Sequence, residues 1–406
     1  MDLGQGYGHL TYSTLVHPGD TWAEMRASLE KYVPEVKRRF CPDESMGVSL
    51  RISNSSADTL INDPGERARL KSWLDDHDMY VYTVNAFPFG PFKGELVKEE
   101  VYEPDWTTEA RTQYTMNVAR ILTEITGDDV EPTIQTAPLA FRPRVVDDAY
   151  VAAFTDNLLR VVAFLMDLER ETGRRVKLAL EPEPYCFLET IPETVEYFAG
   201  HVYTTAAALR VAELSGQPLA EVFQGLRRYL GVVFDICHQS VEFEDIEADL
   251  QMLVDAAIPI YKLQEASALN VPEVTDEIVS ELKRYTDTIY LSQTTEKRAG
   301  QITRYLNLED AIEAYDADPG PRSWRTHFHV PVFLDDLGPF RTTRDGIDAA
   351  LAFHARSPLS THLEIETYTW DVLPDHLTTG DITEYVIREH EYVRDELARQ
   401  VDNQTR

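Results

Sequence analysis

The sequence predicts a (β/α)₈ barrel, because eight short strand-like runs alternate with longer amphipathic helical stretches along 406 residues. Such alternation indicates βαβ units and a parallel sheet, and eight units favour a closed barrel over an open sheet. A minimal barrel needs roughly 250 residues, so the chain has room for insertions. Its length alone would also permit two or three smaller domains. We interpret residues 1–406 as a single domain.

The strand candidates are rich in apolar and β-branched residues. They are Gly8–Val16, Gly47–Ser53, Met79–Ala86, Glu131–Leu139, Val176–Leu180, Gly231–Asp235, Ile258–Gln264 and Thr361–Glu366. Helical patterns lie between them, at Thr21–Phe40, Gly65–His77, Trp106–Ile125, Asp147–Thr172, Thr194–Leu230, Asp245–Ala256 and Thr343–Ala355. No GxGxxG or GxxxxGK motif follows any of these strands, which weakens a nucleotide-binding interpretation.

One segment, residues 286–333, exceeds the eight units. It contains the strand-like run RTHFHVPVF at Arg325–Phe333. We interpret the segment as an insertion near the seventh strand. The alternative is that this run is itself a barrel strand and that one of the eight candidates is wrong.

Charge and composition narrow the class of protein. The chain has 70 acidic and 38 basic side chains, a net charge of −32, which disfavours nucleic acid as a partner. Three cysteines without a CxxC pattern predict neither a disulfide framework nor a thiolate zinc site. We find no signal peptide and no run approaching the ~20 apolar residues of a membrane helix. The sequence therefore predicts a cytoplasmic enzyme for small molecules, without membrane insertion.

Polar side chains end four successive strand candidates. Glu181 ends the fifth strand, Asp235 the sixth and Glu366 the eighth, while Lys262 and Gln264 share one face of the seventh. Barrel active sites lie at these carboxyl ends. Carboxylates facing into a barrel are costly unless they are paired or bind a cation. An oxygen-rich set suits Mg²⁺ or Mn²⁺, with Co²⁺ or Zn²⁺ as alternatives. Each carboxylate taken alone could instead be a rim group paired with Arg or Lys.

Histidines add a weaker signal. His238 follows Asp235 by three residues, and His327 and His329 share one face of a strand. The latter spacing suits a metal or phosphate site, although a structural histidine pair would show the same spacing. Lys262 could hold a substrate oxyanion or be the partner of a barrel carboxylate.

The set of strand ends resembles the xylose isomerase-like barrel superfamily of sugar isomerases and ketose 3-epimerases. In the epimerase branch, Glu, Asp, His and Glu at the ends of strands five to eight bind one divalent metal, and Asp-x-x-His marks strand six. Glu181, Asp235 and Glu366 match this pattern, and FDICH supplies His238. Gln264 stands where that branch has histidine, so either Gln264 or His329 is expected to complete the metal site.

Longer motifs resemble the EboE-type metabolite traffic proteins within that superfamily. They are HLTYSTLVHPGDTW, VNAFPFGPFKGELVKEEVYEPDW, LEPEPYCFLET, FDICHQSVEFED, RTHFHVPVF and LEIETYTWDVLP. The group's name implies metabolite handling but does not specify a reaction. The resemblance draws attention to Asn85, Lys93 and Lys98, in a loop that could cover the site or be purely structural.

The leading hypothesis is a metal-dependent isomerase or epimerase of a sugar, a cyclitol or a phosphorylated relative, acting through an enediolate. Glu181 and Glu366 would exchange the proton, while His238 and Lys262 would contact substrate oxygens. Further substrate contacts are assigned to His9, Asn85, Lys93 and His327.

Two rival hypotheses remain. One is phosphoester hydrolysis by two or three zinc ions, with His9, His238, His327 and His329 as ligands. The other is a barrel that binds and hands on a metabolite without catalysis. The superfamily resemblance also admits a homodimer, for which the sequence identifies no interface.

Overall fold

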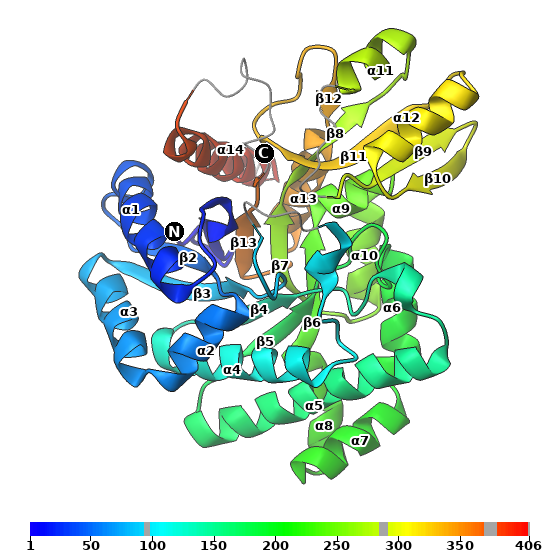
Figure 1. Cartoon of the computed structure of the whole chain (residues 1–406). Coiled ribbons are helices and arrows are strands. Elements are labelled where there is room, and N and C mark those ends of the chain that lie inside the picture. Colours follow the sequence, from blue (N-terminus) through cyan, green and yellow to red (C-terminus); the bar gives the residue numbers. More distant parts are fainter. Residues whose placement is uncertain (93–97, 284–290, 369–379, 405–406) are drawn as a thin grey trace.

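The computed structural model describes residues 1–92, 98–283, 291–368 and 380–404. Its centre is an eight-stranded parallel sheet in the order β1-β13-β7-β6-β5-β4-β3-β2 (Figure 1). A parallel bridge between Ser13 and Ser49 brings the two outer strands together and closes the ring. The predicted (β/α)₈ fold is therefore confirmed.

Each strand of the barrel coincides with one of the eight strand candidates. The strands are β1 (His9–Tyr12), β2 (Met46–Arg51), β3 (Met79–Asn85), β4 (Thr133–Thr136), β5 (Lys177–Leu180), β6 (Leu230–Asp235), β7 (Ile260–Glu265) and β13 (His362–Ile365). Every residue of β2, β4, β6 and β13 is buried. Helices cover the outside and side chains fill the inside, which is why these runs are nearly continuously apolar.

Gly231 shows how closely the barrel strands approach one another. A Cβ atom at this position would lie 2.4 Å from the carbonyl oxygen of Pro259, at the start of the neighbouring strand. Only glycine avoids that contact without moving the backbone. The pairing of β6 with β7 also shifts register between Val232 and Val233, just above this point.

Helices form the outer layer. They are α1 (Trp22–Phe40), α2 (Asn54–Asn62), α3 (Pro64–Asp76), α4 (Glu109–Ile125), α5 (Asp148–Thr172), α6 (Ile191–Tyr197), α7 (Thr205–Ser215), α8 (Leu219–Tyr229), α10 (Ile246–Asp255), α13 (Arg344–Arg356) and α14 (Ile382–Gln404). The predicted helix Thr194–Leu230 is divided into α6, a π-helical turn (Phe198–Val202), α7 and α8. Gly216 allows the break between α7 and α8, because its φ is 66°. Helix α14 contacts both α1 and α13 and so completes the ring.

Helix α5 is long and apolar enough to cross a membrane by length and composition alone. Its apolar residues have another explanation, because Phe154, Leu158, Val161 and Leu165 are buried in the main core. The helix also contacts α4, α7 and α8. A buried helix of a barrel core also meets these criteria of length and composition, so they are weak evidence that α5 spans a membrane.

A second sheet follows β7 directly and projects from the barrel mouth (Figure 1). It is antiparallel, in the order β10-β9-β11-β8-β12, with β8 (Ser267–Val271), β9 (Thr294–Arg298), β10 (Gln301–Tyr305), β11 (Ser323–Val330) and β12 (Arg341–Thr342). Helices α11 (Asp276–Leu282) and α12 (Leu308–Ala317) pack on it around a separate core that includes Trp324 and Phe340.

This sheet extends beyond the predicted insertion, residues 286–333, at both ends. The strand β8 begins at Ser267, two residues after β7 ends, and lies before the predicted insertion. Residues 286–290 of the predicted range lie outside the described residues. The run Arg325–Phe333 contributes to β11 of this sheet, so it is not a strand of the barrel.

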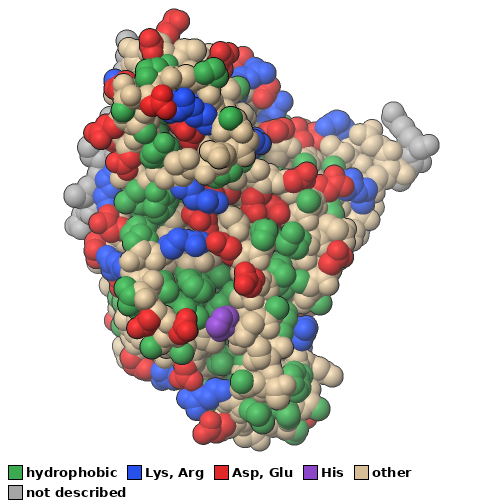
Figure 2. Space-filling model, turned by 90° about the vertical axis from the view of Figure 1, so that its right-hand side faces the viewer, with side chains coloured by type: hydrophobic (Ala, Val, Ile, Leu, Met, Phe, Trp, Pro, Cys, Tyr) green, Lys and Arg blue, Asp and Glu red, His purple; other side chains and the backbone are tan. Residues whose placement is uncertain are grey.

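Charged side chains of both signs are interspersed on the face shown in Figure 2. Lys and Arg occur there in small groups among Asp and Glu, without a continuous basic stripe. Surfaces that bind nucleic acid usually carry clustered Lys and Arg side chains, unlike this face.

Candidate functional site

The residues predicted at the strand ends meet at one place in the barrel mouth. Asp235 is the last residue of β6, Gln264 lies near the end of β7, and Glu181 and Glu366 directly follow β5 and β13. Parallel strands present their carboxyl ends at the same edge, so these side chains converge. All four are at most 4% exposed.

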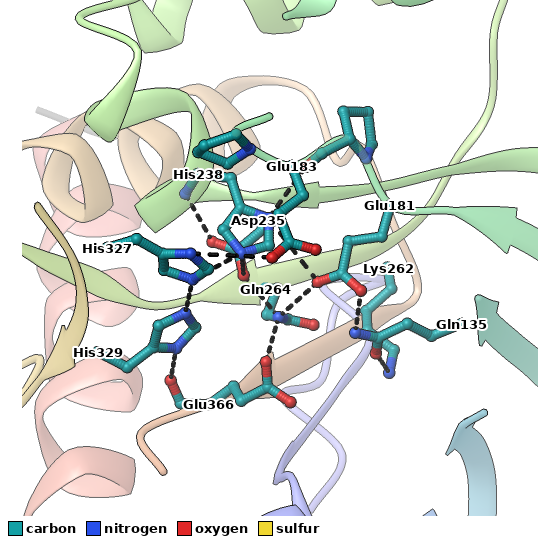
Figure 3. A network of polar contacts seen from close by, with 12 residues as sticks. Gln135, Glu181, Glu183, Asp235, His238, Lys262, Gln264, His327, His329 and Glu366 are labelled. Atoms are coloured by element: carbon teal, nitrogen blue, oxygen red, sulfur yellow. Dashed lines mark hydrogen bonds and ion pairs between the residues drawn. The ribbon is translucent and has the colours of Figure 1, made fainter. Parts of the chain in front are cut away.

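The amide of Gln264 is the centre of this cluster (Figure 3). Its Nε2 atom lies 2.6 Å from Asp235 Oδ2, 2.6 Å from Glu366 Oε2 and 3.0 Å from Glu181 Oε1. An amide nitrogen carries two hydrogens, so it cannot donate fully to three carboxylates. The three carboxyl groups therefore offer more acceptor atoms at one position than a single amide can satisfy.

Burial sets the proton affinity of these acids. It raises the pKa of Glu181 and of Glu366 well above the ordinary value, and the neighbouring carboxylates raise both further. Burial also raises the pKa of Asp235, to about 7. Without a counter-charge, the cluster is therefore expected to retain protons at neutral pH.

A divalent cation fits this cluster. Three carboxylates and an amide are the oxygen donors that Mg²⁺ and Mn²⁺ prefer. The Oε1 atom of Gln264 is buried and has no hydrogen-bond partner among the described residues. A rotation of the amide by about half a turn would exchange nitrogen for oxygen at the centre, since the two orientations are nearly isosteric. In that orientation Gln264 would present an oxygen to a cation at the centre of the cluster.

The raised pKa values predict that metal affinity depends on pH. A cation must displace the protons held by Glu181, Asp235 and Glu366, so affinity should rise as pH increases from about 5 to 8. For each proton that the cation displaces, the metal affinity should rise about tenfold per pH unit. Calorimetric titration with Mn²⁺ in buffers of different ionisation enthalpy would count the protons released. Affinity that is constant over this range would contradict the prediction.

Three histidines lie beside the carboxylates. His238 is in α9 (Ile236–Val241), where Asp235 caps the helix by accepting a bond from the His238 backbone N–H at 3.1 Å. His327 and His329 come from β11 of the second sheet and point into the same space (Figure 3). Burial lowers the pKa of His238 and His327 well below the ordinary value, and that of His329 to about 4. The rings are therefore neutral at physiological pH.

Lys262 lies one layer deeper in the barrel. Its Nζ atom donates to Gln135 Oε1 at 2.6 Å and to Glu364 Oε2 at 3.0 Å, and the side chain is fully buried. Gln135 in turn donates to Glu181 Oε2 at 2.6 Å. These contacts favour the interpretation of Lys262 as the partner of a barrel carboxylate, connected to Glu181 only through Gln135.

The predicted substrate contacts separate into two groups. Asn85 is at the mouth and donates to Glu366 Oε1 at 3.0 Å. His9 is at the opposite end of the barrel, where it begins β1 and bonds to the hydroxyl of Tyr80 at 2.7 Å. This position corrects its assignment to substrate and to a zinc site, because the first residue of a barrel strand lies at the amino end of the strand, away from the mouth. Lys93 lies outside the described residues.

A hollow with a cavity volume of about 50 Å³ opens above the cluster, partly to solvent. Glu181, Glu366 and all three histidines line its floor, together with Glu183 and Asn85. Its walls include Leu15, Phe87, Phe92, Lys98, Tyr102 and Tyr368. A cavity of this size holds a few water molecules, and the loop after β3 contributes several of its walls, as the sequence motif suggested.

Three functional candidates were not predicted from sequence. Glu183 is 5% exposed and accepts a bond from the Tyr102 hydroxyl at 2.8 Å, and burial raises its pKa to about 8. Gln135 supports Glu181, and Gln293 bonds to His327. Gln135 could have been found by the same strand-end rule, since it is a polar residue near the end of β4.

The fold and the site together define a (β/α)₈ barrel whose mouth gathers carboxylate and imidazole groups, the donor types that bind divalent metals. No protein-family model and no curated protein sequence matches the chain.

Solved structures of low similarity do match. A D-tagatose 3-epimerase-like protein is 11% identical, with a TM-score of 0.49 over 98% of this chain and 100% of that one. The IOLI protein with a bound zinc atom is 12% identical, with a TM-score of 0.47 over 96% and 98% of the two chains. A xylose isomerase-like TIM barrel protein from Mycobacterium smegmatis, in complex with magnesium, is 9% identical, with a TM-score of 0.47 over 99% of each chain. Identities and scores this low leave the chemistry of the site to be argued from its own residues.

Proposed function

We propose that the protein is a divalent-metal-dependent isomerase or epimerase of a small polyhydroxylated metabolite. The observation that carries this proposal is the placement of two glutamates on one pocket floor. Glu181 and Glu366 approach the Gln264 amide from different sides and both line the hollow (Figure 3). Two carboxyl groups so placed can remove a proton from a carbon centre and return it from another direction.

The chain's own residues account for the steps of such a reaction. Glu181, Asp235, Glu366 and Gln264 would hold the cation, which when bound supplies Lewis-acid polarisation of adjacent substrate oxygens. Glu181, in its ionised form, would take the proton from a carbon next to a carbonyl, giving an enediolate, and Glu366, in its protonated form, would deliver its own proton to the other face. Asn85, which bonds to Glu366, holds that carboxyl in place.

The pocket walls support a substrate of this kind. Aromatic side chains such as Phe87, Phe92 and Tyr102 suit the carbon faces of a sugar or cyclitol ring, while Lys98 adds a positive charge that would attract a phosphorylated one. The resemblance of the sequence motifs to EboE-type metabolite traffic proteins is compatible with a substrate of this class.

Solvent isotope exchange tests this function directly. Protein loaded with Mn²⁺ and incubated in D₂O with a panel of sugars, cyclitols and their phosphates should introduce deuterium at one carbon of at least one compound. Mass spectrometry would detect a mass increase of one unit. If no member of a broad panel exchanges, while the same protein binds Mn²⁺, the isomerase proposal fails.

The three buried histidines favour phosphoester hydrolysis as a second candidate function, because imidazole-rich sites hold the zinc ions used to activate water. Release of inorganic phosphate from a phosphorylated panel member, without isotope exchange in the recovered substrate, would support this candidate over the first.

A further inference from the structure

The three mouth histidines direct the same atom toward one another. His238 Nε2 is 3.1 Å from His327 Nε2, and His327 Nε2 is 3.0 Å from His329 Nε2. All three side chains are at most 5% exposed. The atoms come from two separate parts of the fold, since His238 follows barrel strand β6 and the other two belong to β11 of the second sheet.

The other ring nitrogen of each histidine determines the tautomer. Each Nδ1 faces a carbonyl oxygen: Pro182 O at 2.9 Å, Gln293 Oε1 at 3.0 Å and Glu366 O at 2.6 Å. The orientation of the Gln293 amide is supported by its Nε2 atom, which donates to the Tyr102 hydroxyl and to Pro184 O. Carbonyl oxygens only accept hydrogen bonds, so each Nδ1 carries the proton.

In a neutral imidazole with a protonated Nδ1, Nε2 offers only a lone pair. Two lone pairs at about 3 Å do not form a hydrogen bond, and here three face a shared space. Metal-binding histidines show the same arrangement, with one nitrogen on the ion and the other donating to a carbonyl or carboxylate.

We propose that His238, His327 and His329 hold a second divalent cation, of the zinc class, beside the carboxylate-bound one. Imidazole nitrogen favours Zn²⁺ and similar ions over Mg²⁺ or Mn²⁺. Glu183 is available as a further ligand, because it lies within metal-binding distance of His238 and His327. Its Oε2 atom is buried without a hydrogen-bond partner in the described part of the chain.

Asp235 connects the two cation positions. Its Oδ2 atom is 2.6 Å from Gln264 Nε2, at the centre of the carboxylate cluster, and 3.6 Å from His238 Nε2. Asp235 accordingly belongs to both groups of ligand atoms, one with Glu181 and Glu366 and the other with His238 and His329. Asp235 would therefore contribute to both cation positions, as a carboxylate shared within a two-metal site does.

The second sheet gains a specific role from this proposal. It supplies two of the three imidazoles, and Gln293, which orients His327, directly precedes its strand β9. The insertion thereby completes the site with ligands that the eight barrel units do not contain.

Counting bound ions tests the proposal. The full chain would be stripped with a chelator, titrated with Zn²⁺ and Mn²⁺ together, and analysed by mass spectrometry of the metals. Wild-type protein should hold two ions per chain, one of them zinc. The double variant His327→Gln/His329→Gln should lose the zinc and keep one ion, the Mn²⁺. Glu366→Gln should weaken the Mn²⁺ site and retain zinc.

The matched control is His201→Gln, which changes an exposed histidine of the π-helical turn Phe198–Val202 and should still hold two ions. Circular dichroism verifies the fold of each variant, and the visible absorption of Co²⁺ reports whether nitrogen ligands are lost. Saturation of the wild-type protein at one ion would overturn the proposal. So would loss of both ions from a folded double variant, since one shared ion would then explain the cluster. Ion counts do not involve turnover, so they can succeed where the isotope-exchange experiment fails.

Discussion

Replacing Glu366 by glutamine is expected to lower the rate of proton exchange by about 10²- to 10⁴-fold, the usual contribution of a general acid or base. Glutamine preserves the volume and the hydrogen bond from Asn85 but cannot accept a proton at the reacting carbon. Glu181→Gln should have an effect of similar size. Deuterium incorporation, measured at saturating substrate and saturating Mn²⁺, checks both variants.

The two variants should also differ in which epimer of the substrate they fail to deprotonate. If each glutamate serves one face of the substrate carbon, Glu181→Gln blocks proton removal from one epimer and Glu366→Gln blocks it from the other. Exchange measured separately from each epimer would show opposite asymmetry. The matched control, Glu277→Gln, changes an exposed glutamate of α11 and should exchange at the wild-type rate. Exchange by both site variants within threefold of wild type would contradict the proposed roles.

The barrel and the carboxylate cluster could be predicted from the sequence for a physical reason. A polar residue directly after an apolar strand must lie at the carboxyl end of a parallel barrel, and all such ends meet. Glu181, Asp235 and Glu366 obey this rule. His9 fails it, because it precedes the apolar residues of β1 and therefore lies at the opposite end. The rule needs the direction of each strand as well as its position.

The second sheet limits what the sequence can predict. The alternation in HFHVP showed that His327 and His329 share a face, but their neighbours depend on how an inserted sheet docks on the barrel. No local pattern specifies that docking. The orientation of Gln264 raises the same difficulty, since its role depends on three carboxylates contributed by three other strands.

Replacing Lys262 by methionine should destabilise the fold by about 3–5 kcal/mol, the cost of leaving one charge of a buried ion pair without its partner. Lys262 and Glu364 are both fully buried, with Nζ and Oε2 3.0 Å apart. The second oxygen of Glu364, Oε1, has no hydrogen-bond partner among the residues described. Urea unfolding of the metal-free protein would measure the change.

The double variant Lys262→Met/Glu364→Met distinguishes a structural role from a catalytic one. Replacing both members of a buried pair by apolar groups of similar volume is often neutral or stabilising, so the double variant should recover most of the lost stability. Arg38→Met, which breaks an exposed pair with Glu35, should change the unfolding midpoint little because water already screens that pair. A single Lys262→Met variant of wild-type stability would show that the pair does not support the barrel. Lys262 reaches Glu181 only through Gln135. We therefore expect its replacement to change the stability of the fold before it changes the activity.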